Sequence, residues 1–308
     1  MSRHENTSSD KRDVYATVTT QIIDAIQKGV GTWRMPWHTS GQYAFSPINV
    51  ASRKAYRGIN TLCLWAAAEA KGYQSGEWGT YKQWQERGAQ VRKGEKSTTV
   101  VFWKFSNDAQ ESQEHGDEHE SCASRLLFTR GYAVFNGGQV DRYEAKVEPA
   151  PTLLERIEKA DALFNSVGAD LRHGGNRAYY APDLDYIQMP PFGAFVENTR
   201  YYSTLAHEHT HWTAKPGRCD RQLGKRFGDN AYAAEELIAE LGAAFVCAQL
   251  GLSTEPREDH AQYINSWLGV LKTDKRAIFT AASKAQQACD WLIKRAERPA
   301  VASNGVAA

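Results

Sequence analysis

One short motif limits what this chain can fold into, because it needs a helix to bring its side chains together. Residues 207–211 read His-Glu-His-Thr-His, which places two imidazoles four positions apart, at His207 and His211. On an α-helix, positions i and i+4 lie on one face, so both imidazoles can reach the same metal ion. The pattern therefore predicts a helix from about Asn198 to Ala214 that carries two metal ligands.

The carboxylate beside the first histidine extends the motif to H-E-x-x-H, which is typical of zincin metallopeptidases. Zinc lowers the pKa of a bound water to roughly 7, and Glu208 stands where it can accept the proton of that water. The resulting hydroxide would attack a carbonyl that the metal polarises. We expect Zn²⁺ here, and other divalent metals such as Mn²⁺ are compatible with the same ligands.

A catalytic zinc site needs a third protein ligand, and the next helix offers three carboxylates. Residues 232–250 predict a helix that contains Glu235, Glu236 and Glu240. Because Glu236 and Glu240 are i and i+4, both can face the motif. We predict Glu236 as the metal ligand and Glu240 as the partner that orients a ligand histidine. Glu235 points about a quarter-turn away and is the reserve ligand.

Other residues near the motif have less determined roles. The strand predicted at Tyr186 to Met189 could pair with an extended peptide substrate. His209 lies about 160° round the helix from the metal-facing edge, so it packs or meets solvent. Tyr201, Tyr202 and Tyr232 are equal candidates for stabilising a transition state.

The length and the pattern of segments predict an α+β chain of two domains. The 308 residues suffice for a front domain over 12–144 and a mostly helical domain with a small sheet over 150–296. Polar tails at 1–11 and 297–308 are expected to be disordered. An acidic stretch, 107–124, is expected to be a mobile loop between two strands.

Periodicity supplies the expected elements of the first domain. Apolar spacing predicts helices over Val14–Ile26, Ile59–Lys71 and Trp78–Arg87, the second closed by a glycine. Composition predicts a strand over Thr98–Phe105 that pairs with one over Leu126–Phe135. The acidic loop joins these two strands.

Cysteine usage and hydropathy indicate the compartment. The five cysteines are odd in number and widely spread, and they form no CxxC pair. This favours a reducing compartment, so we expect a cytoplasmic protein. No apolar run approaches the length of a membrane span, and the polar N-terminal residues do not suggest a signal peptide.

The front of the chain is basic and rich in tryptophan. Residues 1–105 hold 15 Lys+Arg against 8 Asp+Glu, an excess of +7, and six of the nine tryptophans. Single-stranded nucleic acid needs such a surface, because exposed bases stack on aromatic rings and phosphates pair with cations. The residues predicted to contact single-stranded DNA are Trp33, Arg34, Trp37, Arg53, Lys54, Tyr56, Arg57, Lys82, Trp84, Arg92, Lys93 and Lys96.

Core packing is the alternative for these aromatic residues. It is favoured for Trp65 and Trp103, which lie in apolar runs. For the aromatics that stand beside basic residues, glycine or proline, both interpretations are open. The basic turn Arg92–Lys96 is equally compatible with a phosphate contact and with a solvated turn.

Several ordered motifs, taken together, resemble one family. They are Tyr-Arg-Gly-Ile-Asn at 56–60, Trp-Gly-Thr-Tyr at 78–81, Arg-Lys-Gly-Glu at 92–95, Tyr-Ala-Val-Phe-Asn at 132–136, the motif at 207–213, and Glu-Glu-Leu-Ile-Ala-Glu-Leu-Gly at 235–242. This set resembles the ArdC-type antirestriction proteins of conjugative plasmids, and the front part is also similar to plasmid TraC-type primases. The resemblance implies single-stranded-DNA binding, a zincin-like domain and protection of incoming plasmid DNA from restriction. His207, Glu208 and His211 match the family motif.

Three other functions are open at this point. One is a protein that only coats single-stranded DNA and whose zinc is structural. Another is a regulatory metallopeptidase that cleaves a host protein. The third is an accessory module of a primase, which the lack of a polymerase-like acidic constellation disfavours.

Overall fold

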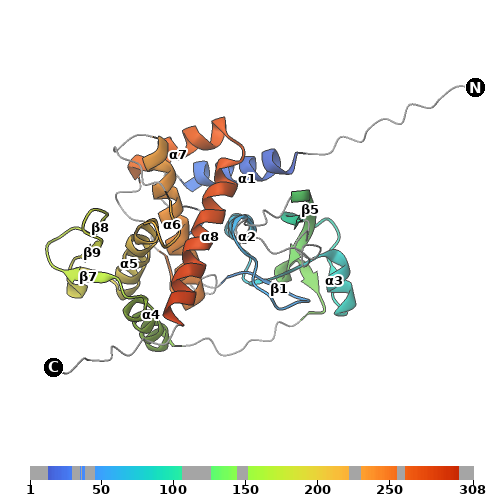
Figure 1. Ribbon diagram of the computed structural model, residues 1–308. Coiled ribbons are helices and arrows are strands. Elements are labelled where there is room, and N and C mark those ends of the chain that lie inside the picture. The colour runs from blue at the N-terminus through green and yellow to red at the C-terminus, as the bar shows by residue number, and fades with distance from the viewer. Residues whose placement is uncertain are drawn as a thin grey trace, which may run out of the picture.

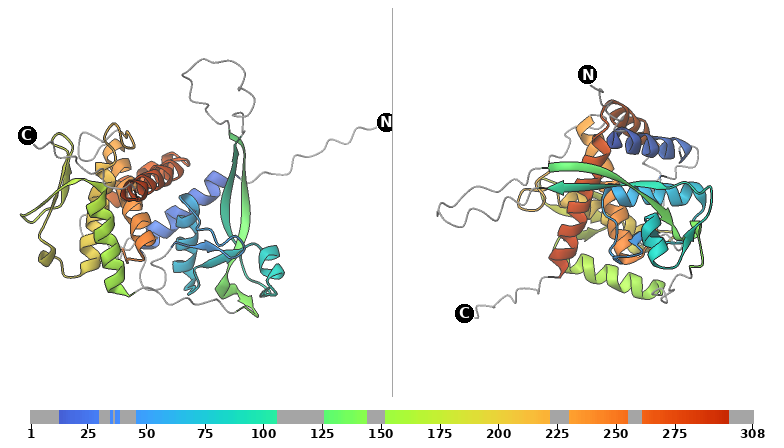
Figure 2. Two further views of the ribbon diagram at one scale, coloured as in Figure 1. Left: turned by 60° about the horizontal axis from the view of Figure 1, so that its bottom comes forward. Right: turned by 90° about the vertical axis from the view of Figure 1, so that its right-hand side faces the viewer.

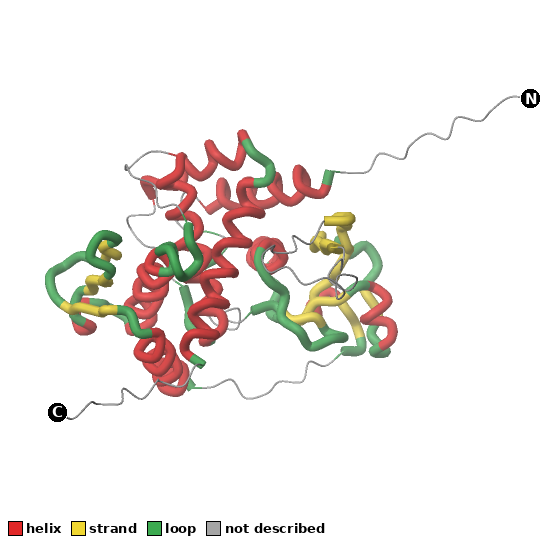
Figure 3. Tube along the Cα trace, viewed as in Figure 1, coloured by secondary structure: helices red, strands yellow, loops and turns green. Residues whose placement is uncertain are grey.

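The computed structural model describes residues 13–29, 35, 37–38, 46–105, 126–143, 152–221, 230–254 and 261–297. Several expectations fall outside these residues: the terminal tails except Glu297, the acidic loop, and the two predicted DNA contacts Trp33 and Arg34. Figure 3 shows the described part as two groups of strands at opposite ends with helices between them.

The front domain is an α+β unit. Its elements are α1 (Val14–Gly29), β1 (Ile48–Asn49), α2 (Ile59–Lys71), β2 (Glu77–Gly79), α3 (Tyr81–Glu86), β3 (Gln90–Val91), β4 (Thr98–Phe105), β5 (Leu126–Asn136) and β6 (Val140–Asp141). The main sheet has the order β1-β2-β5-β4, and β3 pairs with β6 in a second, two-stranded sheet. The predicted pairing of β4 with β5 is confirmed, with Thr98 opposite Val134.

The helix predicted at Trp78–Arg87 is wrong at its start. Trp78 lies in β2, where it pairs with Asn136 of β5. The helix begins only at Tyr81, because Thr80 forms a capping box: its hydroxyl accepts from the Gln83 amide while the Gln83 side chain accepts from the Thr80 amide. Apolar periodicity did not reveal this change from strand to helix.

The rear domain is mostly helical. It contains α4 (Leu153–Val167), α5 (Asn198–Trp212), α6 (Asn230–Leu250), α7 (Ala261–Thr273) and α8 (Ala277–Ala296), together with a small sheet of β7 (Asp170–His173), β8 (Tyr179–Ala181) and β9 (Tyr186–Met189). The sheet has the order β7-β9-β8 and lies at the outer end of the helices (Figure 1). Among the described helices, none combines the length and apolar character that a membrane crossing requires.

The two domains share one continuous hydrophobic core. Buried side chains of α1 and α2, such as Ile22 and Leu62, belong to the same cluster as Leu241 of α6 and Ala282 of α8. In Figure 1, α1 lies beside α7, and it also contacts β5 of the front sheet. The Thr19 hydroxyl donates to the Lys275 carbonyl at 2.7 Å and fixes this contact. The front domain is therefore anchored on the rear helices.

Candidate functional site

Two histidines and one glutamate converge between α5 and α6. His207 Nε2 and His211 Nε2 are 3.1 Å apart, as the i, i+4 spacing requires. Glu236 reaches across from α6, with its oxygens 3.6 Å from His207 Nε2 and 3.5 Å from His211 Nε2. Among the described residues, these three form the one group of His, Cys, Asp and Glu side chains that could hold a metal ion.

The triangle of donor atoms fits a small divalent metal. A tetrahedral ion with bonds of about 2.1 Å separates its ligand atoms by about 3.4 Å. Here the two nitrogens are 3.1 Å apart, and the nearest carboxylate oxygens are Oε2 of Glu236 at 3.6 Å from His207 Nε2 and Oε1 at 3.5 Å from His211 Nε2, all close to this spacing. Two imidazole nitrogens and one carboxylate are also a donor set that zinc accepts, with one position left for water. The residues present thus fit the group that the sequence motif implies.

Each of the two histidines has a carboxylate behind it. His207 Nδ1 lies 2.8 Å from Glu240 Oε1, and His211 Nδ1 lies 3.4 Å from Glu235 Oε1. Such partners fix the ring orientation and make the other nitrogen a better ligand. The geometry agrees with the role expected for Glu240. It places Glu235, the reserve ligand, behind His211 rather than in the donor triangle.

Arg221 supports this arrangement, and the sequence interpretation missed it. The guanidinium is buried and donates to both oxygens of Glu235, at 3.2 and 2.8 Å. It also donates to the Thr213 hydroxyl and the Thr210 carbonyl. A buried cation with a full set of acceptors can hold a carboxylate in one place. Arg221 follows α5 in a turn, where no periodic pattern marks it.

The carboxylates give the site a strong negative field. Burial acts to raise the pKa of Glu236, but hydrogen bonds from His207 and His211 lower it well below its usual range. Burial acts to lower the pKa of His211, but hydrogen bonds to Glu235 and Glu236 raise it to about 10. Because buried charge needs a counter-charge, these carboxylates stabilise either a proton or a metal cation at this point.

Close packing of the two helices makes these distances attainable. A Cβ placed on Gly242 of α6 would come within 2.5 Å of Oγ1 and Cγ2 of Thr210 on α5. The helix backbones therefore approach more closely at Gly242 than any side chain allows. Gly242 is therefore the residue that permits the close approach of α5 and α6.

A short segment of the front domain reaches the back of the site. His38 is buried, its Nδ1 accepts from the Met35 amide at 3.0 Å, and its Nε2 lies 3.8 Å from Glu240 Oε2. The neighbouring Trp37 is 0% exposed, and its carbonyl accepts from the Thr254 hydroxyl at 2.9 Å. His38 thus extends the line of contacts from His207 through Glu240.

The remaining motif residues take distinct positions. Glu208 is buried on α5 beside His207. His209 packs: it is 0% exposed, its Nδ1 lies 2.8 Å from the Leu205 carbonyl, and burial lowers its pKa to about 4. The phenol of Tyr201 contacts His173 Nε2 at 2.8 Å.

The other two tyrosines differ in their surroundings. The Tyr202 hydroxyl donates to Asp161 at 2.7 Å, away from the donor triangle. Tyr232 lies one turn before Glu236 on α6 and is half-buried. Burial, Tyr263 and Glu236 together raise the pKa of Tyr232. Tyr232 is thus the tyrosine that shares α6 with Glu236, one turn away.

The predicted substrate-binding edge is wrong. β9, at Tyr186–Met189, is the central strand of its sheet: it pairs in parallel with β7 and antiparallel with β8. Both of its edges are occupied within the chain, so it has no free backbone groups for a peptide. The free edges of this sheet belong to β7 and β8.

Two predicted DNA contacts are also wrong. Trp37 and Trp84 are both 0% exposed. The Trp84 indole donates to the Phe135 carbonyl at 3.0 Å, and Trp37 packs near Trp267 with ring centroids 6.0 Å apart. Neither ring has a face for a base, because burial in the core takes precedence over the basic sequence around them.

The other predicted contacts separate into paired and unpaired cations. Arg53 pairs with Glu77, Arg57 with Asp290 of α8, Lys82 with Glu86, and Arg92 with Glu95 and Asp141. Lys54, Lys93 and Lys96 are exposed, and no carboxylate pairs with them within the described part of the chain. Tyr56 is half-buried, and its hydroxyl accepts from Asn49 at 3.0 Å.

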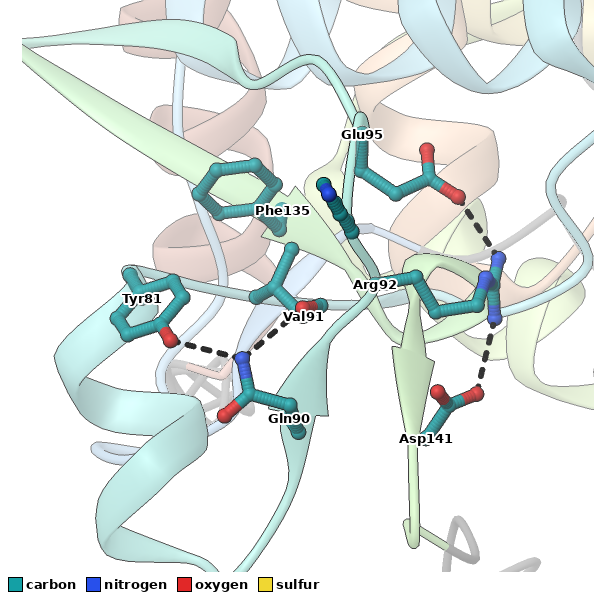
Figure 4. Close-up of a pocket in the computed structure, with 8 residues that line it drawn as sticks. Tyr81, Gln90, Val91, Arg92, Glu95, Phe135 and Asp141 are labelled. Atoms are coloured by element: carbon teal, nitrogen blue, oxygen red, sulfur yellow. Dashed lines mark hydrogen bonds and ion pairs between the residues drawn. The ribbon is translucent and has the colours of Figure 1, made fainter.

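A cavity of about 620 Å³ lies where the two small strands meet β5 (Figure 4). Tyr81 and Phe135 flank it, and Gln90 donates to the Tyr81 hydroxyl at 2.7 Å. Arg92 turns toward Glu95 and Asp141, so its charge is balanced within the cavity. The full lining comprises Tyr81, Gln90, Val91, Arg92, Lys93, Glu95, Phe135 and Asp141.

Two family profiles divide the chain in the same order as the structure. The profile for the N-terminal domain of the anti-restriction factor ArdC matches residues 12–135, and a zincin-like metallopeptidase profile matches residues 158–284. Among full-length relatives, the protein y4eC of Sinorhizobium fredii is 52% identical over 94% of each chain. A DNA primase TraC of Escherichia coli is 33% identical over 94% of this chain, which corresponds to 20% of the primase.

Solved structures agree with this assignment. The crystal structure of the antirestriction ArdC protein from plasmid R388, in its metal-free form, superposes with a TM-score of 0.72 at 41% identity, covering 92% of this chain and 98% of that one. Its Mn(II)-bound form gives the same TM-score at 40% identity, covering 93% and 99%. The chain therefore belongs to the ArdC family of antirestriction proteins and carries a zincin-like metallopeptidase domain in its C-terminal half.

Proposed function

We propose that this protein binds incoming single-stranded DNA through its front domain and protects it from restriction, and that its rear domain is a metallopeptidase. The convergence of His207, His211 and Glu236, two of them buried and His211 partly buried, carries the proposal. Membership of the ArdC family supports the protective role. Conjugation delivers DNA as a single strand, which suits a chain that joins both domains in one core.

The donor set favours zinc as the metal. Imidazole and carboxylate ligands in a four-coordinate arrangement suit Zn²⁺, and Mn²⁺ accepts the same groups. A structure of the R388 relative contains Mn(II). We therefore expect binding of either ion, with zinc the tighter of the two, as the general order of affinities predicts.

A catalytic site is favoured over a structural one. Structural zinc sites normally use four protein ligands, whereas catalytic sites use three and leave a position for water. The described residues supply three ligand atoms here. This favours the peptidase over a DNA-coating protein whose metal only stabilises the fold.

The protein side chains have separate tasks in this proposal. The metal supplies Lewis-acid activation of water and of a peptide carbonyl. Glu208 accepts the proton of the attacking water at its carboxylate and passes it to the leaving amine. Tyr232 donates a hydrogen bond from its hydroxyl to the developing oxyanion, because it lies one turn before Glu236 on α6. Glu240 and Glu235 hold the two ligand rings.

Exposed cations of the front domain bind the phosphates of the DNA in this proposal. The ammonium groups of Lys54, Lys93 and Lys96 have no carboxylate partners in the described residues, so phosphates can pair with them.

We place this action in the cytoplasm, where the free thiols of Cys63, Cys247 and Cys289 stay reduced. A host protein is the proposed peptide substrate.

Glu208→Gln separates the peptidase from the DNA-binding role. We expect it to abolish hydrolysis of fluorescein-labelled casein while it leaves zinc affinity and oligo-dT affinity unchanged. Glu158 is an exposed residue of α4, so Glu158→Gln is the matched control. This variant should hydrolyse casein and bind zinc and oligo-dT as the unsubstituted protein does.

Protection is then measured as the efficiency of plasmid transfer into a restricting host. Loss of protection in Glu208→Gln would show that proteolysis is the protective act. Retained protection would show that DNA coating suffices, and the protease account of protection would be wrong. Full casein hydrolysis by Glu208→Gln would contradict the proposed role of the motif.

A further inference from the structure

Two aromatic rings stand exposed on the long ribbon of β4 and β5. Phe102 is 51% exposed and Tyr132 is 37% exposed. Their centroids are 6.1 Å apart with the ring planes at 88°. Among the described residues of the front domain, Tyr81 is the other aromatic residue with a large exposed surface. Exposed aromatic pairs cost free energy in water, so they indicate a binding surface.

A cation completes this pair. Arg130 lies directly across the ribbon from Phe102, in the register that places Val100 across from Tyr132. The Arg130 guanidinium carbon is 5.2 Å from the Tyr132 ring centroid. Because side chains alternate between faces, all three lie on the same side. No carboxylate pairs with Arg130 among the described residues. We call Phe102, Arg130 and Tyr132 the ribbon cluster.

The two faces of the ribbon have different environments. Helix α1 covers the opposite face: the Tyr15 hydroxyl lies 3.5 Å from Thr129 Oγ1 and accepts from the Trp103 indole at 3.4 Å. On the cluster's own face, Val100 and Val134 are buried farther along the ribbon. Among the described residues, this face is therefore buried at Val100 and Val134 and exposed at Phe102 and Tyr132.

In the described part of the sheet, the β5 edge of the ribbon is free of other strands around the cluster, whereas on the β4 edge the Asn60 side chain bonds both backbone groups of Val101. β2 pairs with β5 only at Phe135 and Asn136, so at Arg130 to Tyr132 the partner of β5 in the described sheet is β4 alone. Figure 2 shows the two strands extending as a ribbon beyond the rest of the front sheet. A flexible strand can therefore pass across this face without displacing another element.

We propose that the ribbon cluster is a stacking site for successive bases of single-stranded DNA. The proposal rests on the single-stranded-DNA binding proposed above and names the residues that hold the bases. Phe102 and Tyr132 offer ring faces, and the planar guanidinium of Arg130 can stack on a base or pair with a phosphate. Stacking tolerates every base, as a protein that accepts any incoming sequence requires. Duplex DNA buries its base faces and cannot use the site.

The test measures the affinity of the full-length chain for a fluorescent oligo-dT by anisotropy. Base stacking on an aromatic ring contributes about 1–3 kcal/mol, so Phe102→Ala and Tyr132→Ala should each weaken binding about 5- to 150-fold. Tyr132→Phe keeps the ring and should bind as the unsubstituted protein does. An abasic oligomer of equal length should bind all four proteins equally weakly, because it offers phosphates without bases.

Tyr81→Ala is the matched control, since Tyr81 is similarly exposed at 47% but lines the cavity of Figure 4. It should leave affinity unchanged. Weakening by Tyr81→Ala alone would place the bases in the cavity and overturn the proposal. Unchanged binding by both ribbon variants would also overturn it. If the unsubstituted protein binds no oligo-dT, the proposed DNA-binding function fails, and the ribbon site with it.

A second measurement needs no substitution. Oligomers carrying 5-iodouracil crosslink under ultraviolet light to aromatic residues that stack on them. Peptide mapping should recover Phe102 or Tyr132 as the crosslinked residue. Recovery of other residues alone would contradict the ribbon site, even where an alanine variant fails to fold.

Discussion

His38 Nε2 lies 3.8 Å from Glu240 Oε2, and the other oxygen of Glu240 lies 2.8 Å from His207 Nδ1. One residue comes from the segment after α1 and the other from α6, so the front domain contributes to the support of His207, a predicted metal ligand. The candidate metal site is therefore not a property of the rear domain alone.

Loss of this support should weaken metal binding. Removal of a carboxylate that orients a ligand histidine typically costs 10- to 100-fold in metal affinity, and we expect this from Glu240→Gln. His38→Ala should weaken affinity in the same direction by a smaller factor, because it acts through Glu240. Titration calorimetry with Zn²⁺ checks both, with Glu158→Gln as control. Equal affinity of His38→Ala and the unsubstituted protein would show that the contact is only structural packing.

Two glycine substitutions should have opposite effects on the free energy of unfolding. Gly242 lies at the close approach of α5 and α6, whereas Gly269 has open space around it. An alanine at Gly242 would clash with Thr210, and overpacking typically costs about 1–3 kcal/mol. At Gly269 of α7 nothing lies within 4 Å, so alanine should stabilise by about 0.5–1 kcal/mol through helix propensity. Urea unfolding measures both. Stabilisation by Gly242→Ala would show that the helices separate without cost.

Metal binding should stabilise the folded chain. A ligand that binds only the folded state adds about 2.7 kcal/mol at 100 times its dissociation constant. Zn²⁺ should therefore raise the melting temperature of the unsubstituted protein, and a chelator should reverse the rise. His207→Ala removes one of the three donor atoms and should show little response. An equal rise in His207→Ala would mean that zinc binds elsewhere.

Stability should depend on acid pH through Asp185. Burial acts to raise its pKa, but hydrogen bonds from Arg218, Lys215 and Tyr180 lower it to about 2. Because the folded pKa lies below the unfolded value of about 3.9, the stabilisation is present above pH 4 and is lost as pH falls toward 2. We expect a contribution of about 1–2 kcal/mol at neutral pH.

Asp185→Asn tests this contribution. Asparagine tolerates the left-handed backbone at this position, where φ is 56°, so the change removes charge with little strain. The difference in unfolding free energy between the two proteins should be largest near pH 7 and should shrink below pH 4. A difference that stays constant with pH would rule out the charge as its cause.

Tyr232→Phe tests the tyrosine beside Glu236. If its hydroxyl stabilises the oxyanion, its loss should lower kcat about 100-fold and leave KM and zinc affinity unchanged. Tyr202→Phe, whose hydroxyl contacts Asp161 instead, is the matched control. A rise in KM with constant kcat would assign Tyr232 to substrate binding.

The sequence by itself determined the motif helix, its two histidines and the pairing of β4 with β5, because local periodicity encodes which side chains share a face. For the same reason, the sequence limited the candidates for a third metal ligand to the glutamates of one helix. Burial and strand order are set by contacts between distant segments, which no local pattern carries. The burial of Trp37 and Trp84 and the central position of β9 were therefore decided only by the tertiary structure. The same holds for the positions of Arg221 and His38 behind the two histidines, and for the exposure of Phe102 and Tyr132.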